Sequence, residues 1–491
     1  MIALPPLRRP LAAAAALLLA ALLLAGCAGL APHDTFRTSA GLARASAGAE
    51  ARLATSDDER RALAAEVEAM LKTPLDLDAA VRLALINHPG LQATYHEAGI
   101  AQADLVQATR LRNPSFGFAR MSGGGEREIE RGVAFDLAGL LTMPLRQRMA
   151  ARRHEETTLR IAAAIERHAH DTRRAWIEAV AARQALDYAR QVAAAADAAS
   201  ELTARMRQAG NASALDLARE QAFHAEAGAA VLRAGRALDS ARERLTRQLG
   251  LWGEQAGYTL PERLPDLPAQ PSDAKDVERL AQERRLDVRT ARAAAAGTAS
   301  DLGLTRATRL VNVFDLGYAS KSETGKQRSE GYEIALELPL FDWGGARVAR
   351  AESLYMQALG QVAQAAVDAR SQARAAYLGY RASYDVARHY REHVLPLRKK
   401  IADETLLRYN GMLASPFELL LDAREQAAAV HAAIEAQRDF WLADTELRAA
   451  LGGPLPAPDA SHHEQLHEQH HEQHREQHRH HSTHDQKEPT P

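Results

Sequence analysis

The chain has 491 residues and a formal net charge of −2, so it carries no overall basic field of the kind that binds nucleic acid. Hydrophobic residues make up 46% of the sequence and aromatic residues only 5%, because much of the apolar content is alanine. A composition rich in alanine, arginine and glutamate favours long helices over a compact aromatic core.

The first part of the chain has the pattern of a cleaved secretory signal. Two arginines precede an apolar run over residues 11–24, and small residues then lead to Cys27, the only cysteine. The apolar run is shorter than the roughly 20 residues of a membrane-spanning helix. The pattern resembles a bacterial lipoprotein signal. That resemblance implies that residues 1–26 are removed, that Cys27 carries covalent lipid and, because Ala28 follows, that the protein is sorted to the outer membrane. The alternative is an ordinary signal or anchor helix with an incidental cysteine.

An internal repeat with a period near 200 residues organises most of the chain. Three pairs of segments match in the same order: Ala108–Leu111 with Ala307–Leu310, Phe116–Ala119 with Leu316–Ala319, and Leu217–Gln221 with Asp422–Gln426. Several matches in one order indicate a duplication. We therefore expect a leader over residues 27–73, one repeat over 74–260, a second over 273–452, and a disordered histidine-rich tail over 453–491.

Each repeat is predicted to contain a helix, a β-hairpin and two long helices. The hairpins are expected at about residues 114–139 and 311–339. In the second hairpin four apolar residues alternate with three others: Tyr332, Ile334, Leu336 and Leu338 with Glu333, Ala335 and Glu337. A period of two predicts a strand with one apolar and one polar face. If the apolar face meets lipid, Glu333 and Glu337 line the lumen.

Four strands are too few to close a sheet in lipid, where open edges are not tolerated, but three chains would supply twelve. The strands therefore predict a trimer if they lie in a membrane. The alternative is two surface hairpins on a soluble helical protein.

The predicted helices are unusually long. The run Met143–Gln208 has no glycine and no proline after Pro144, and as one helix it would extend about 100 Å. Three further helical runs are Ala212–Leu249, Ala346–Arg408 and Ser415–Leu451. Pro396 is expected to kink or break the run that contains it. Helices of this length must lie against neighbours, so a rod-like adaptor or filament remains the alternative.

Three stretches resemble motifs of the TolC-like outer-membrane efflux family. They are LDAAVRLALINHPGLQ at Leu77–Gln92, ELPLFDWGGAR at Glu337–Arg347, and YNGMLASPFELLLDAREQ at Tyr409–Gln426. The resemblance implies an α+β membrane protein of the lipoprotein, heavy-metal, RND-type subgroup. It implies a homotrimer in which four strands per protomer build a twelve-stranded outer-membrane β-barrel above a long α-helical coiled-coil barrel. It also implies two partners, a periplasmic adaptor and an inner-membrane RND-type pump.

Two glycines lie between paired long helices. Gly210 and Gly411 are each predicted to end a helix in the left-handed conformation. The resemblance implies that the resulting turns are periplasmic tips at the channel entrance. Pro416 and Phe417 read as an insertion into the family pattern after the second glycine.

Acidic residues follow both tips: Asp216, Glu418 and Asp422. In a trimer each carboxylate near the axis would occur three times and form a ring that gates the channel or docks the adaptor. The alternative is an ordinary solvated helix surface.

Ten of the 20 histidines lie in the C-terminal tail. They are His462, His463, His467, His470, His471, His474, His478, His480, His481 and His484. The low complexity predicts disorder, and neutral imidazole binds Cu²⁺, Zn²⁺, Ni²⁺ or Co²⁺. The hypothesis is heavy-metal efflux with weak, flexible metal binding by the tail. The alternative is a solubilising tail with incidental metal affinity.

The sequence contains no G-x-S-x-G or Walker A motif, and H-E-x-x-H occurs only as part of the low-complexity tail, at His463–His467 and His467–His471. Lipidation would consume the only thiol. We therefore expect no enzyme activity and no cofactor beyond the lipid and loosely bound metal. Two further alternatives share parts of this interpretation. One is a channel of the same fold for organic compounds or for type I protein secretion, and the other is a periplasmic helical lipoprotein without a barrel.

Overall fold

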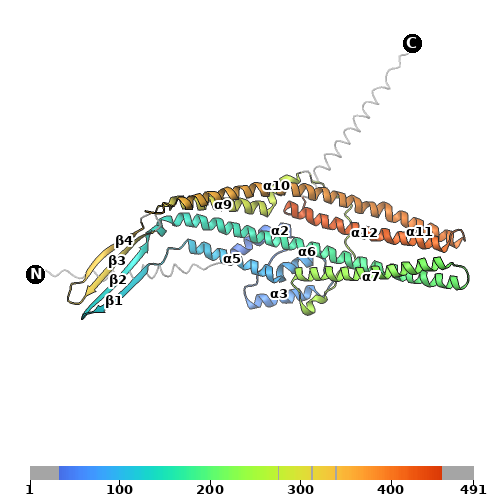
Figure 1. Ribbon diagram of the computed structural model, residues 1–491, viewed down its shortest axis with the longest axis horizontal. Coiled ribbons are helices and arrows are strands. Elements are labelled where there is room, and N and C mark those ends of the chain that lie inside the picture. The colour runs from blue at the N-terminus through green and yellow to red at the C-terminus, as the bar shows by residue number, and fades with distance from the viewer. Residues whose placement is uncertain (1–32, 275, 311–312, 338–339, 456–491) are drawn as a thin grey trace, which may run out of the picture. The chain divides into compact units, whose positions relative to one another are not determined.

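The computed structural model describes residues 33–274, 276–310, 313–337 and 340–455. These residues form two compact units, each built from three stretches of the chain (Figure 1). Apart from the gaps, unit 1 contains residues 33–39, 93–161 and 292–360, and unit 2 contains residues 40–92, 162–291 and 361–455. Each unit draws on both halves of the chain, so neither coincides with one predicted repeat.

The described chain is mostly helical, with four strands. In chain order the elements are α2 (His33–Ala47), α3 (Asp57–Met70), α4 (Leu77–Asn87), α5 (Pro89–Ala108), β1 (Ser115–Gly123), β2 (Glu126–Asp136), α6 (Leu137–Gln208), α7 (Ala214–Leu249), η1 (Gly253–Gly257), α8 (Val277–Arg284), α9 (Leu286–Ala307), β3 (Phe314–Glu323), β4 (Ser329–Leu336), α10 (Gly345–His389), η2 (Tyr390–Val394), α11 (Leu395–Asn410) and α12 (Pro416–Leu451). The strands lie within the two ranges expected for the hairpins.

The four strands form one antiparallel sheet in the order β1-β2-β3-β4. The two hairpins meet where β2 pairs with β3, with Val133 opposite Tyr318. The β1–β2 turn consists of Gly124 and Gly125, whose φ values are 61° and 87°. A two-residue type I′ turn has positive φ at both positions, which glycine adopts without steric cost. The predicted four strands are confirmed.

The longest helix, α6, has 72 residues and begins earlier than the sequence predicts. It starts at Leu137 and not at Met143, and it continues through Pro144. Asp136 caps the new start, since its carboxylate accepts a hydrogen bond from the backbone N–H of Gly139. Proline removes one helical hydrogen bond but fixes a helical φ, so a helix already capped at Asp136 runs through it.

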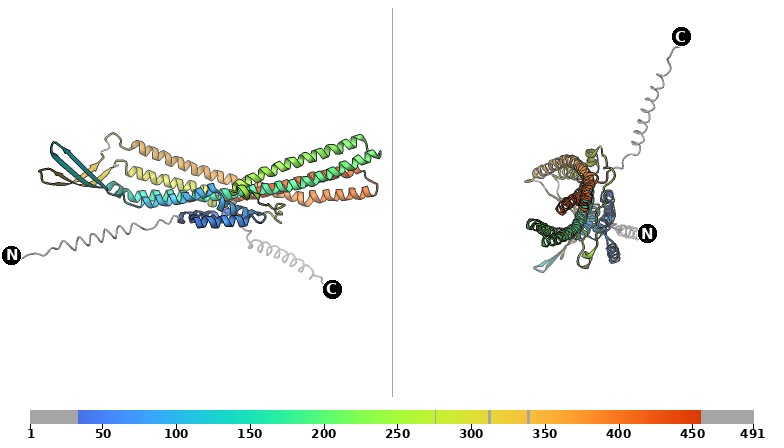
Figure 2. Two further views of the ribbon diagram at one scale, coloured as in Figure 1. Left: turned by 90° about the horizontal axis from the view of Figure 1, so that it is seen from below. Right: turned by 90° about the vertical axis from the view of Figure 1, so that its right-hand side faces the viewer.

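The interruption expected at Pro396 is a π-helical turn, η2, between α10 and α11. The N–H of Leu395 donates to the carbonyl of Tyr390, and Pro396 lies in the first turn of α11. Because proline has no N–H, the wider π turn accommodates the missing helical bond. The chain then continues as α11, which lies beside α12 as an antiparallel pair (Figures 1 and 2).

Two apolar clusters form the core of unit 2. In the first, Trp176 of α6 packs with residues of α3, α4 and α7, and its indole N–H donates to the carbonyl of Leu75 at 2.8 Å. The second is aromatic. The ring of Phe440 lies 5.6 Å from the rings of both Tyr380 and Tyr384. Such aromatic pairs each contribute about 0.5–1.5 kcal/mol beyond the area they bury.

Asn87, the last residue of α4, forms hydrogen bonds with the end of α7. Asn87 donates from its side-chain amide to the carbonyls of Leu249 and Gly250 at 2.9 and 3.0 Å. Gly250 ends α7 with φ 66°, and a Cβ on it would lie 2.8 Å from the Cα of His88. Both the left-handed conformation and the close approach therefore require glycine at this position.

We predict that Gly250→Ala lowers the free energy of unfolding by about 2–4 kcal/mol, because it adds backbone strain and a steric clash. Gly228, inside α7, has no atom near its virtual Cβ. Gly228→Ala is the matched control and should raise stability by up to about 1 kcal/mol. Thermal unfolding of the purified variants measures both. Equal effects would contradict this explanation.

Candidate functional site

Both long helical hairpins of unit 2 end in turns of the same design. After α6, Gly210 has φ 80°, the left-handed conformation that the sequence predicts. The N–H of Asn211 donates to the carbonyl of Met206 at 2.8 Å, and the N–H of Gly210 to that of Arg207 at 3.0 Å. These two bonds define a Schellman motif, which satisfies the last carbonyls of the helix.

The second turn corrects the prediction for Gly411, whose φ is −82°. Met412 is the left-handed residue there, with φ 61°. The N–H of Leu413 donates to the carbonyl of Arg408 at 2.8 Å, and that of Met412 to Tyr409 at 3.0 Å. This is the same Schellman pattern, with a methionine where the first turn has its glycine. Helix α11 ends at Asn410 and Gly411 is its C-cap, so the left-handed residue comes one position later than the sequence predicts.

Serine caps begin the returning helices. Ser213 accepts from the N–H of Asp216 at 3.1 Å, and Ser415 accepts from the N–H of Glu418 at the same distance. Pro416 occupies the first turn of α12, a position that suits its fixed φ. Each serine follows the left-handed residue by three positions, so the two turns have the same length. The insertion of Pro416 and Phe417 relative to the family pattern stays a prediction.

The three acidic residues at the tips have different surroundings. Asp216 accepts hydrogen bonds from the hydroxyl and the backbone N–H of Ser213 at 2.6 and 3.1 Å, which holds the pKa of its carboxyl below the ordinary value. Asp422 accepts from the hydroxyl of Thr405 on α11, and Glu418 is exposed. Two of the three carboxylates therefore stabilise the hairpins, and a role in gating stays a prediction.

The sequence analysis missed an ion pair between the two hairpins. Glu220 of α7, which is 4% exposed, accepts from Arg424 of α12 at 2.7 Å. The guanidinium lies 4.2 Å from the ring centre of Phe223. Glu220 Oε2 and Arg424 Nε make no further hydrogen bond. Removing one partner of such a buried ion pair strongly destabilises the fold, because it leaves an unpaired buried charge. The pair therefore couples α7 to α12.

A second group missed from the sequence surrounds Glu166 on α6. Burial and the charge of Asp287 raise the pKa of the Glu166 carboxyl to about 7, against the opposing charges of Arg285, His170 and Arg167. The group therefore holds a proton under conditions in which a solvated glutamate is ionised. No motif links these residues, since they come together only when α6 packs against the start of α9.

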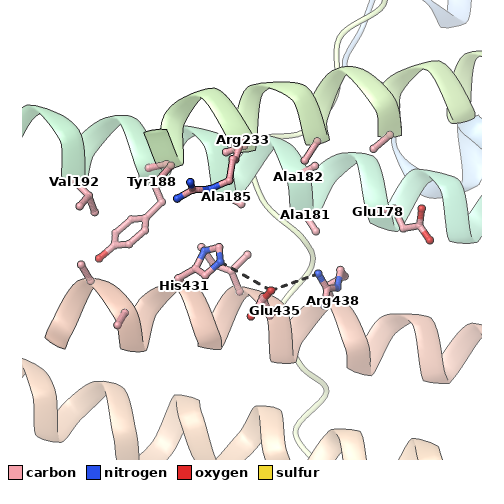
Figure 3. A pocket seen from close by; sticks show the side chains of 18 of the residues that line it. Glu178, Ala181, Ala182, Ala185, Tyr188, Val192, Arg233, His431, Glu435 and Arg438 are labelled. Carbon is pink, nitrogen blue, oxygen red and sulfur yellow. Dashed lines mark ion pairs between the residues drawn. The ribbon is translucent and has the colours of Figure 1, made fainter. Parts of the chain in front are cut away.

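A cavity of about 900 Å³ lies between α6, α7 and α12, and alanine is the most frequent residue in its walls (Figure 3). Among its charged residues, Glu435 lies 3.9 Å from both His431 and Arg438 on the same helix. Such pairs one turn apart are a common feature of helix surfaces.

The sheet of unit 1 has one apolar and one polar face. One face carries Phe116, Phe118, Val133, Phe135, Phe314, Leu316, Tyr318, Tyr332, Ile334 and Leu336, which the strand registers bring into adjacent rows. Tyr332 is 84% exposed and Phe116 69%. Exposed aromatic and branched residues on one sheet face form a surface suited to lipid or to another apolar surface.

Glu333 lies on the opposite face of β4, as the alternation predicts, and it is paired with Gly317 of β3. Glu337 is not a strand residue, because β4 ends at Leu336. It still extends the pairing by one bond, since its N–H donates to the carbonyl of Val313 at 3.2 Å. On the same face Lys321 makes an ion pair with Glu128.

Cys27 and the ten tail histidines lie outside the described residues. Within the described ranges, no helix is long and apolar enough to cross a membrane. The same ranges contain no group of three or more His, Cys, Asp or Glu side chains placed to hold a metal ion.

No protein-family model matches this sequence, and no curated protein matches it either. Solved structures do match. The CmeC outer membrane channel of Campylobacter jejuni aligns with a TM-score of 0.64 and 14% identity over 85% of this chain and 92% of that chain. The MtrE outer membrane channel of Neisseria gonorrhoeae, in its open state, gives 0.64 and 18% over 78% and 90%. The outer membrane protein VceC of Vibrio cholerae gives 0.62 and 16% over 80% and 97%.

The chain has the TolC-like outer-membrane channel fold. The expected single-chain fold, long helices with four antiparallel strands, is confirmed, and the trimer and the twelve-stranded barrel stay predictions. Within this channel fold, Gly210 and Met412 are the turning points of the two helical hairpins.

We predict that Met412→Gly stabilises the channel fold by about 1 kcal/mol, because glycine removes the cost of a left-handed conformation. The control is Gly411→Ala. A Cβ on Gly411 would meet only ordinary contacts of 3.5 Å or more, so this change should be close to neutral. Thermal unfolding of both variants decides between the two residues. Marked destabilisation by Gly411→Ala alone would restore the original prediction.

We predict that Glu166→Gln changes the pH dependence of stability. Between pH 4.5 and about 7 the folded chain keeps the Glu166 proton while the unfolded chain releases it. The stability of the natural chain therefore falls as pH rises through this window. Glutamine does not ionise, so the variant gains stability relative to the natural chain over the same range. Chemical unfolding across the window measures this, with Glu226→Gln on the exposed surface of α7 as control. A constant difference would show that Glu166 does not titrate there.

Proposed function

We propose that the chain is the outer-membrane channel of a tripartite efflux system and that it conducts substrates passively from the periplasm to the exterior. The carrying observation is the channel fold, which aligns with at least 90% of the length of each of three solved outer-membrane channels or proteins. The exposed apolar face of β1–β4 supports the proposal, since three such sheets joined as a twelve-stranded barrel would turn that face to lipid. The same observations favour a channel over a helical lipoprotein rod.

A passive channel has no energy source of its own, so the proposal includes partners that supply the energy. We propose a homotrimer, anchored by lipid on Cys27, that receives substrates through a periplasmic adaptor from an inner-membrane RND-type pump. The support is the lipoprotein-like N-terminus together with the channel fold. The hairpin ends at Gly210 and Met412 would be the periplasmic entrance, where Glu418 is exposed and available to a partner.

We propose that the entrance opens when the two hairpins of a chain move apart. The ion pair between Glu220 and Arg424 opposes this movement, because it joins α7 to α12 near their tip ends. By contrast, Arg398 and Glu425 form an ion pair within the second hairpin, where opening would leave it intact.

The double variant Glu220→Gln/Arg424→Gln should therefore raise the conductance of the protein in planar lipid bilayers, while Arg398→Gln should leave it unchanged. Replacing both partners avoids a buried unpaired charge. Equal conductance of the double variant and the natural chain would reject this ion pair as a restraint on the entrance. It would leave the channel assignment intact.

For the substrate we propose heavy-metal ions such as copper, zinc or cobalt. The support is the ten-histidine tail, whose imidazoles bind late transition metals. The fold itself serves equally for organic compounds or secreted proteins, so the substrate rests on the tail alone.

Metal tolerance of a deletion strain tests the substrate. The strain is complemented with the natural gene or with a full-length version in which the ten tail histidines are glutamine. Sensitivity to copper, zinc, cobalt or nickel, without sensitivity to a dye and an antibiotic, is the expected result. The glutamine version should restore tolerance only in part. Sensitivity to organic compounds alone would refute metal efflux and leave the channel standing.

A further inference from the structure

Two histidines lie together at the π-helical turn of unit 2. His389 is the last residue of α10, and His393 lies within η2. Their ring centres are 5.2 Å apart, with an angle of 50° between the ring planes. Both side chains are exposed, so ions in solution can reach both rings.

The turn brings the rings onto one side of the helix. Residues four apart on a helix are neighbours, and two histidines at this spacing are a known arrangement for one bound metal. Here the intervening backbone is the π turn that accommodates Pro396, with Leu395 donating to Tyr390. The π turn therefore sets the spacing of the two residues along the helix.

The separation fits coordination of one ion by both rings. A late divalent metal binds imidazole nitrogen at about 2.0–2.1 Å, so two nitrogens on one ion are at most about 4.2 Å apart. Each nitrogen lies roughly 1.1 Å from its ring centre, so centres up to roughly 6.5 Å apart allow a shared ion. The observed 5.2 Å meets this limit.

A carboxylate near the two rings reduces the positive charge that a bound cation would meet. The carboxylate of Glu392, between the two histidines, accepts from Arg388 at 2.8 Å and from Arg391 at 2.9 Å. The Glu392 carboxylate therefore offsets part of the electrostatic repulsion that the two guanidinium groups would exert on a bound cation. Among the described hydrogen bonds, none involves the imidazole ring of His389 or His393.

A second histidine pair in unit 2 differs in each of these respects. The rings of His88 and His168 lie 4.4 Å apart, but both are partly or largely shielded from solvent. The N–H of Leu91 donates to Nδ1 of His88, and Nε2 of His168 lies 3.0 Å from the carbonyl of Gln248. One nitrogen of each ring is thus already used, so this pair is a structural contact and provides an internal comparison.

We propose that His389 and His393 form a two-imidazole site for a late divalent transition-metal ion, with water in the remaining positions. Copper(II) should bind most tightly, followed by nickel(II) or zinc(II), as nitrogen ligands prefer. This site is separate from the tail, and it goes beyond the proposed function because it does not depend on which substrate the channel conducts.

The test uses the full-length chain with the ten tail histidines replaced by glutamine, titrated with less than one equivalent of Cu²⁺. Pulsed electron paramagnetic resonance counts the imidazoles bound to the ion. Two are expected in this parent protein. His389→Gln and His393→Gln should each reduce the count and weaken Cu²⁺ binding by at least about tenfold, because the second bond is intramolecular.

His431→Gln is the matched control, since His431 is also exposed on a helix of unit 2 but has no neighbouring imidazole among the described ring contacts. It should leave both the count and the affinity unchanged. A single bound imidazole in the parent protein, or equal affinity in the parent and both site variants, would overturn the proposal. Because all three side chains are exposed, circular dichroism should show the same helix content in every variant.

Discussion

The sheet of β1–β4 imposes the main physical constraint on this protein. One face carries rows of exposed aromatic and branched residues, and β1 and β4 are its edge strands. An edge strand presents unpaired N–H and C=O groups, and leaving these in lipid costs several kcal/mol for each group. In the proposed trimer, pairing β1 of one chain with β4 of the next would remove both edges. One chain supplies only four strands. Whether the sheet closes therefore depends on how many copies of the chain assemble.

The helices of unit 2 meet a different requirement, because a long helix is stable only when neighbours cover it. Both hairpins use a Schellman turn and a serine cap, and their returning helices, α7 and α12, each have 36 residues. Both helices end at a left-handed glycine, and each glycine lies close to the backbone that joins two earlier helices: Gly250 near His88 and Gly452 near Arg285. These shared constructions agree with a duplication. When the two serine caps are aligned with each other, the matched segments Leu217–Gln221 and Asp422–Gln426 are offset by three residues.

Local rules predicted much of the fold, and long-range packing explains most errors. Alternation identified the strands of both hairpins. The helical runs predicted at Ala212–Leu249 and Ser415–Leu451 match α7 and α12 to within two residues. The errors lie where context overrides propensity: α6 runs through Pro144, and Met412 takes the strained conformation beside Gly411. The Glu220–Arg424 pair and the Glu166 group join residues far apart in sequence, so one sequence without its fold gave no signal for them.

The central claim is that the functional particle contains three chains. Native mass spectrometry of the protein extracted from outer membranes in mild detergent measures this directly. The account predicts one species with the mass of three lipid-modified chains, which survives dilution because edge pairing links every sheet to two others. A folded single-chain species of unchanged helix content, obtained without any trimer, would contradict the account.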